Sequence, residues 1–248
     1  MQLVWQIEET CLNAFPSLKT VLHGDWLLRF AGGVSRRANS ANPRSAEANA
    51  TPSLIAEIEA LYRAQGQPAI FRVPSIADAG IDQMLTARGY SIEGETCVLH
   101  APVTQEAAAS DTAVWLLAAP TSRWLTAMSA LQVHTPVHAA TYQQIVDAIA
   151  VPVRFASLVV DGEPAALAYG ALHAGLLCYE SVITAPDHRR QGLARRVIAA
   201  LAAWAREAGA DGVCLQVEAT NASARALYTG FGMEESFRYH YRREPPHA

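Results

Sequence analysis

The segment Pro186–Ala194 (PDHRRQGLA) constrains the fold most, because it joins a predicted strand to a long amphipathic helix. The strand is Leu176–Thr184, and the helix is predicted from about Gln191 to Ala208. A tight turn that opens a helix directs unpaired main-chain N–H groups and the positive end of the helix dipole at one place. Such a place binds anions, and a pyrophosphate group fits it. The alternative is an arginine-rich helix start in an ordinary α/β domain.

A second segment, Glu218–Gly232 (EATNASARALYTGFG), follows the predicted strand Val213–Val217. With both segments at this separation, the chain resembles the GNAT superfamily, the Gcn5-related N-acetyltransferases, over about Ala113–Arg243. Arg189-x-x-Gly192-x-Ala194 matches the pyrophosphate motif of that family. The second conserved block of the family is matched by Asn221, Ala224, Leu227-Tyr228 and Gly230-Phe231.

The resemblance implies that acetyl-CoA binds in a V-shaped opening between the strands Leu176–Thr184 and Val213–Val217. The first strand would pair with the pantetheine arm, and the turn would hold the pyrophosphate. The cofactor-binding residues implied in this way are Val182, Ile183, Thr184, Arg189, Arg190, Gln191, Gly192, Leu193, Ala194, Asn221, Ala224 and Tyr228.

Acetyl transfer to an amine needs a proton acceptor, because an alkyl amine with a pKa near ~10 is almost fully protonated at neutral pH. Glu180, on the strand beside the expected acetyl position, is the first candidate for this base, and Glu218 is the second. The resemblance places Tyr228 beside the sulfur, where its hydroxyl can donate to the departing thiolate. The alternatives are a half-buried helix tyrosine and strand glutamates that face solvent.

A weak internal repeat relates the two halves, since Arg63–Gly66 precedes one predicted strand as Arg206–Gly209 precedes another. The N-terminal half lacks a Gly-x-Gly/Ala turn at a helix start, and it resembles the degenerate half of tandem GNAT proteins. The expected fold is therefore α/β, with two GNAT-like subdomains that each have a mixed sheet. The predicted boundaries are a degenerate domain at 1–103, a linker at 104–112 and a complete acetyltransferase domain at 113–248.

Locally, the N-terminal half is predicted to begin with a helix over Val4–Leu22 and to contain a loop over Ser35–Thr51. Polar side chains that face a partner domain suit a small polar ligand, and a solvated surface loop is the alternative. The candidate substrate contacts are Arg29, Arg36, Arg37, Asn39 and Ser40.

The formal net charge of −4 argues against nucleic acid or an anionic membrane as the main partner. Met1–Ser17 has no basic region before an apolar core, so a signal peptide is not expected. We therefore expect a cytoplasmic location. The four cysteines lack metal-ligand spacing, and we expect reduced, buried thiols. His134 and His138 are separated by Pro136, which breaks a helical pair, so no metal site is expected there or elsewhere.

These patterns predict an acetyl-CoA-dependent N-acetyltransferase that acts by direct attack on a primary amine of a small molecule or amino acid. A monomer or homodimer is expected. Two alternatives stay open: a protein acetyltransferase that acts on a lysine or N-terminal amine, and a non-catalytic acyl-CoA sensor. An open acidic groove would favour the first, whereas Tyr228 argues against the second.

Overall fold

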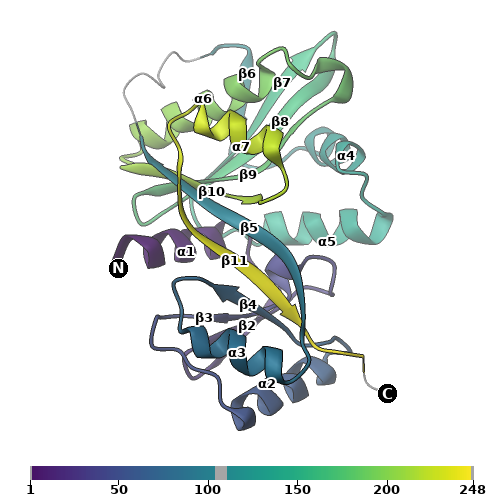
Figure 1. The fold of residues 1–248 in the computed structure, drawn as a ribbon. Helices are drawn as coiled ribbons and strands as arrows, with labels where there is room; N and C mark the ends of the chain where they lie inside the picture. The colour runs from purple at the N-terminus through teal and green to yellow at the C-terminus, as the bar shows by residue number, and fades with distance from the viewer. Residues whose placement is uncertain (1, 104–110, 247–248) are drawn as a thin grey trace.

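The computed structural model describes residues 2–103 and 111–246, and within them one mixed sheet of eleven strands runs through both halves of the chain (Figure 1). In spatial order the strands are β1 (Lys19–His23), β2 (Trp26–Phe30), β3 (Ala41–Pro43), β4 (Ile70–Pro74), β11 (Glu234–Arg243), β5 (Ser91–Pro102), β10 (Gly212–Glu218), β9 (Leu176–Thr184), β8 (Glu163–His173), β7 (Val153–Val160) and β6 (Val114–Leu117).

The two halves exchange strands at the centre of this sheet. β5, from the N-terminal half, pairs with β10 from Gly212↔Pro102 to Glu218↔Thr96. β11, at the end of the chain, pairs with β5 and also with β4. Figure 1 shows β5 and β11 running together from one half to the other. The sequence predicts a sheet in each half, and this exchange joins the two sheets. Most of the predicted linker, residues 104–110, lies outside the described residues.

Helices cover both faces of the sheet (Figure 1). On β9, Leu177 and Tyr179 pack in one core with α6, while Cys178 packs in another core with α1, as expected from the alternation of side chains along a strand. The helices are α1 (Gln2–Ala14), α2 (Pro52–Ala64), α3 (Ala79–Ala87), α4 (Ser122–Leu131), α5 (Pro136–Asp147), α6 (Leu193–Glu207) and α7 (Ala222–Thr229), with short 3₁₀ turns at Arg36–Ala38 and Pro186–His188.

The helix α6 illustrates how the sequence sets these elements. Leu193, Val197, Leu201 and Ala205 recur at helical spacing and are buried against the sheet. Among the described helices, none is both long and apolar enough to cross a membrane.

Two local predictions in the N-terminal half are wrong. The first helix ends at Ala14, two residues before Pro16, and Lys19–His23 forms the edge strand β1 instead of continuing the helix. Proline restricts the residue before it to extended conformations, which explains the stop. The predicted loop over 35–51 contains the short strand β3, which pairs with β2 and β4.

Candidate functional site

The parallel strands β9 and β10 separate in their second halves. They pair from Leu176↔Gly212 to Tyr179↔Leu215, and no pairing between them continues along the described residues beyond that point. On its other side β9 shifts register against β8 between Leu167 and Tyr169, and Ser181 has a φ of 53°. A bulge bends a strand locally, so this one helps to turn β9 away from β10.

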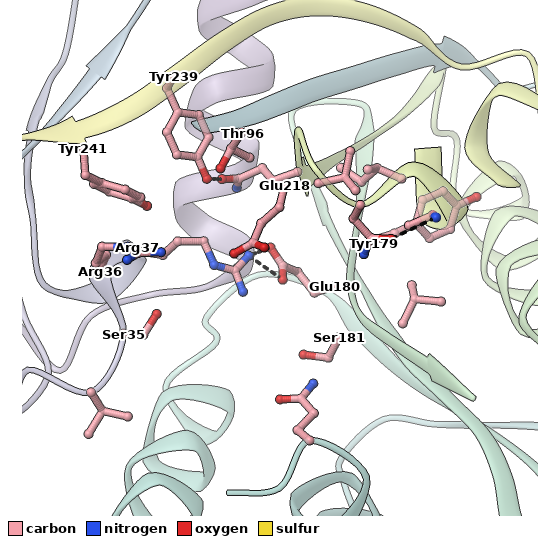
Figure 2. A pocket seen from close by; sticks show the side chains of 18 of the residues that line it. Ser35, Arg36, Arg37, Thr96, Tyr179, Glu180, Ser181, Glu218, Tyr239 and Tyr241 are labelled. Carbon is pink, nitrogen blue, oxygen red and sulfur yellow. Dashed lines mark hydrogen bonds and ion pairs between the residues drawn. The ribbon is translucent and has the colours of Figure 1, made fainter. Parts of the chain in front are cut away.

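A cavity of about 710 Å³ fills the opening between the two strands (Figure 2). β9 contributes Glu180 and Val182 to its lining, and β10 contributes Glu218. The N-terminal half contributes the loop Gly33–Arg37, and β11 contributes Tyr239, Tyr241 and Arg243. The strand exchange in the sheet therefore lets both halves build one pocket.

The turn before α6 has the backbone that an anion site requires. Gly192 is the N-cap residue of α6 with a φ of 77°, and Arg190 has a φ of 62°. A Cβ atom placed on Gly192 would meet no described atom within 4 Å, so the space above this turn is open. Arg189, Arg190 and Gln191 are exposed around it. The free N–H groups of the first helical turn and the open space above Gly192 fit a diphosphate.

Asn221 and Tyr228 lie at the two ends of the short helix α7, and both line the pocket. The Asn221 Oδ1 accepts a hydrogen bond from the Ala224 main-chain N–H at 3.1 Å, which leaves the amide N–H₂ to face a ligand. Burial, and next the negative charge of Glu180, raise the pKa of Tyr228. The Tyr228 hydroxyl therefore stays protonated and can act as a donor.

Glu180 is paired with an arginine from the other half of the chain. The Arg37 Nη1 lies 2.6 Å from Glu180 Oε1 and 2.7 Å from Oε2, and Glu180 is only 3% exposed. Burial raises the pKa of Glu180, and the Arg37 charge opposes that rise. The Arg37 guanidinium also lies 4.2 Å from the centroid of the Phe15 ring. This pairing was not predicted, because nothing local links Arg37 to β9.

Glu218 is exposed at the end of β10. Figure 2 shows Glu218 and Glu180 directed into the same pocket from the two separated strands. The structure therefore brings together both candidate bases, one buried and paired and the other open to solvent.

Of the candidate substrate contacts, Arg36 and Arg37 are among the residues that line the pocket. Arg29 is buried, and its Nη2 donates to the main-chain oxygens of Leu12, at 3.2 Å, and Phe15. Asn39 is also buried, and its Oδ1 accepts from the N–H of Gly33 at 2.9 Å. Asn39 therefore helps to hold the loop that carries Arg36, whereas Arg29 binds the end of α1.

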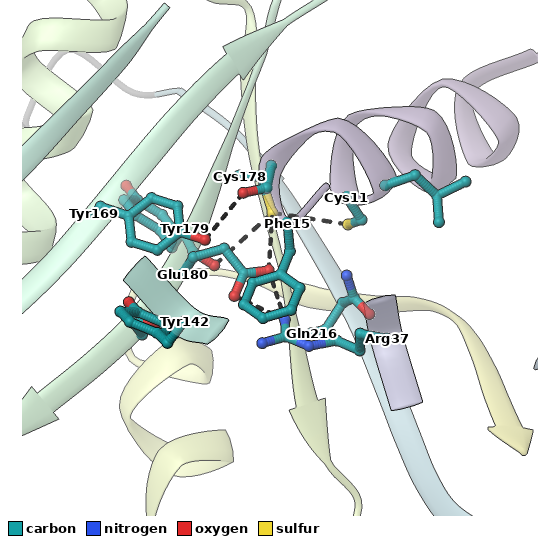
Figure 3. Close-up of polar contacts among 12 residues, drawn as sticks. Cys11, Phe15, Arg37, Tyr142, Tyr169, Cys178, Tyr179, Glu180 and Gln216 are labelled. Atoms are coloured by element: carbon teal, nitrogen blue, oxygen red, sulfur yellow. Dashed lines mark hydrogen bonds and ion pairs between the residues drawn. The ribbon is translucent and has the colours of Figure 1, made fainter. Parts of the chain in front are cut away.

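All four cysteines are buried free thiols, as predicted. Their sequence positions did not indicate that Cys11, Cys178 and Cys214 would meet, yet their sulfur atoms all lie within 4.8 Å of one another. The Cys178 Sγ lies 3.8 Å from Cys11 Sγ and 4.0 Å from Glu180 Oε1 (Figure 3). The Cys178 thiol therefore lies beside the Glu180 carboxylate, and the other two thiols lie beside Cys178.

Comparison with known proteins places this chain in a family. The family model described as "Probable histone acetyltransferase Rv0428c C-terminal" matches residues 4–242. The chain is also 25% identical over 246 residues to the uncharacterized N-acetyltransferase YobR of Bacillus subtilis, and the match covers 98% of this chain and 99% of that protein.

Solved structures of GNAT proteins share the fold. The GCN5-related N-acetyltransferase from Kribbella flavida superposes with a TM-score of 0.70 at 16% identity, covering 99% of this chain and 95% of its own. The tandem GNAT protein from the clavulanic acid biosynthesis pathway superposes with a TM-score of 0.66 at 14% identity, covering 94% of this chain and 86% of its own. A GNAT fold, in the arrangement of a tandem protein, is therefore confirmed.

Proposed function

Because the chain belongs to the Rv0428c C-terminal acetyltransferase family, and through it to the GNAT superfamily, we propose that it transfers the acetyl group of acetyl-CoA to a primary amine of a small molecule. The observation that carries this proposal is the pocket between β9 and β10. It has a buried carboxylate, Glu180, and a buried phenol, Tyr228, in its lining, and the open turn at Gly192 lies at the start of the next helix.

The residues that would hold acetyl-CoA are those of the turn and of the free edge of β9. Main-chain N–H groups of Gly192, Leu193 and Ala194 suit the pyrophosphate, with Arg189 and Arg190 adding charge. The part of β9 around Val182 faces no paired strand on the β10 side among the residues described, so its main chain is available to the pantetheine arm. When bound, acetyl-CoA supplies the acetyl group as a reactive thioester.

The side chains of the pocket would supply the proton transfers. A carboxylate must take a proton from the ammonium form of the acceptor before the nitrogen can attack. Glu180 suits this role, because it lines the pocket and burial raises its pKa, which makes it a stronger base. Tyr228, kept neutral by its raised pKa, would donate to the departing thiolate sulfur.

Glu218 is the alternative base. Its carboxylate is exposed and carries no ion pair among the described contacts, so it can hold a water molecule that relays the proton. In that case the Glu180–Arg37 pair would instead position the acceptor and keep charge balanced beside the thioester.

Acetylation of a protein lysine or N-terminus is the competing function, and the description of the matching family names a histone acetyltransferase. The pocket favours a small acceptor, because the loop Gly33–Arg37 and the strand β11 wall off the side that faces the N-terminal half. A protein tail needs an extended groove instead.

The test is thiol release from acetyl-CoA by the full chain, measured against a panel of amino acids, other small amines and histone-type lysine peptides. Mass spectrometry of each product identifies the acetylated nitrogen. Turnover with one or more small amines supports the proposal. Turnover with lysine peptides alone contradicts it, and acetyl-CoA binding without any turnover would indicate a sensor.

A further inference from the structure

The pocket has a second polar wall, remote in sequence from the catalytic strands. Arg36 Nη1 lies 3.3 Å from Glu93 Oε2, and Arg243 Nε lies 2.6 Å from Glu93 Oε1. The Arg243 and Arg36 side chains hold the pKa of Glu93 below its usual range, so this carboxylate stays ionised. Two guanidinium groups thus share one carboxylate, and the cluster carries one positive charge in excess.

The Arg36 guanidinium packs against the main chain at Gly94, in space that the side chain of any other residue at position 94 would fill. A Cβ atom on Gly94, whose φ is 57°, would lie 2.8 Å from the Arg36 Nη2. The Arg36 guanidinium also lies 5.4 Å from the centroid of the Tyr241 ring. These contacts fix the direction of Arg36 before any ligand arrives, which reduces the entropy lost on binding.

Tyr241 adds an unused donor to this wall. It is 3% exposed, and its hydroxyl has no hydrogen-bond partner in the part of the chain that the structure describes. Its neighbour Tyr239, by contrast, donates to Gln216 Oε1 at 2.6 Å. Figure 2 shows the Tyr241 ring on the Arg36 side of the pocket with its hydroxyl turned inward. Because buried polar groups are normally bonded, an unpaired hydroxyl beside a cationic cluster indicates an anionic ligand.

The catalytic side of the same pocket has the opposite charge. Arg37 and Glu180 neutralise one another, and Glu218 adds a carboxylate beside them. Figure 2 shows Tyr241 and Arg36 on one side of Arg37, with Glu180 and Tyr179 on the other. The pocket is therefore negative where an ammonium group must lose its proton and positive along the wall formed by Arg36, Tyr241 and Arg243.

We propose that the acceptor is an amine that also carries a carboxylate, and that Arg36, Arg243 and Tyr241 bind this carboxylate while the amine faces Glu180. The inference rests on the proposed function, which it narrows to zwitterionic acceptors of the amino-acid class. A carboxylate matches the flat two-donor fork of a guanidinium, and the Tyr241 hydroxyl can donate to it as well.

The test compares each amino acid that serves as acceptor with its carboxamide, which keeps the amine and removes the charge. The wild-type enzyme should show a kcat/KM about 10- to 100-fold higher for the carboxylate, as expected when an ionic hydrogen bond is lost. The variants Arg36→Gln and Tyr241→Phe should lower kcat/KM much more for the carboxylate than for the carboxamide, so that the ratio of the two kcat/KM values falls toward one. The CoA dissociation constant should stay at its wild-type value.

A matched control is Arg123→Gln, which removes an arginine that pairs with Glu163 on the surface and does not line this pocket. It should keep the full preference for the carboxylate. Equal turnover of carboxylate and carboxamide by the wild type would overturn the inference while leaving the acetyltransferase proposal intact. A stronger preference for an amine that bears a phosphate would also overturn it, and absence of turnover with every amine would count against the proposed function itself.

Discussion

The turn at Gly192 provides a sharp test of the cofactor site, through the substitution Gly192→Asp. The left-handed backbone of Gly192 (φ 77°) makes any side chain there cost about 1–2 kcal/mol of stability, although the space above it is open. The carboxylate would lie where the pyrophosphate is expected. Two charges at ~4 Å in a water-like dielectric repel by about 1 kcal/mol, so the two phosphate charges give about 2 kcal/mol.

A loss of about 2 kcal/mol corresponds to roughly 30-fold weaker CoA binding, before any steric contact is added. Isothermal titration calorimetry of CoA measures this, and the loss should shrink at high salt, because the turn is exposed and screened. Gly162→Asp is the matched control, since Gly162 has a φ of 83° and equally open space but lies in the turn between β7 and β8. Gly162→Asp should lower the stability of the fold and leave the dissociation constant for CoA unchanged. If Gly192→Asp binds CoA as tightly as Gly162→Asp does, the phosphates lie elsewhere.

Two further substitutions test ion pairs that hold a buried carboxylate, Arg37–Glu180 between the halves and Arg72–Glu8 within the N-terminal half. Arg37→Gln removes the charge that opposes the effect of burial on the pKa of Glu180, so the acidic limb of the kcat/KM–pH profile should move to higher pH; an unmoved limb would assign the base to Glu218 or to water. Arg72→Met breaks the buried pair with Glu8, whose atoms lie 2.6 Å apart, and should cost about 3–5 kcal/mol in urea unfolding. Burial raises the pKa of Glu8 and the Arg72 charge opposes that rise, so loss of Arg72 makes the folded variant bind a proton at Glu8 more tightly than the folded wild type does. The stability deficit of the variant should therefore be smaller at pH ~5 than at pH ~8, and a deficit independent of pH would contradict this.

The elements that could be predicted from the sequence are those marked by a local pattern of apolar residues or by a glycine turn. The strand Leu176–Thr184 matches β9 at both ends, and the helix expected from about Gln191 corresponds to α6, because apolar spacing and a glycine turn mark them. The edge strand Lys19–His23 was missed, since it is mostly exposed and has no buried face to create an alternating pattern.

Long-range pairings could not be predicted in the same way. Nothing in the sequence of β11 indicates that it lies between β4 and β5, because strand pairing depends on backbone hydrogen bonds that every residue offers. The Arg37–Glu180 pair and the approach of Cys11 to Cys178 follow from that topology. Because β5 and β11 are exchanged between the halves, a cut at the predicted linker would remove β11 from the N-terminal fragment and β5 from the C-terminal fragment.

The most direct test of the account is the substitution Tyr228→Phe, assayed by thiol release under saturating acetyl-CoA and acceptor, with CoA titration on the same variant. The Phe variant keeps the ring, which is 7% exposed, and removes only the hydroxyl. Tyr90→Phe, whose hydroxyl bonds Glu59 in the other half, is the control and should keep full turnover. If the pocket between β9 and β10 is the catalytic site, kcat should fall by about 10²–10⁴ in Tyr228→Phe while the CoA dissociation constant stays unchanged. Full kcat in Tyr228→Phe would contradict the role given to this residue and to the pocket around it.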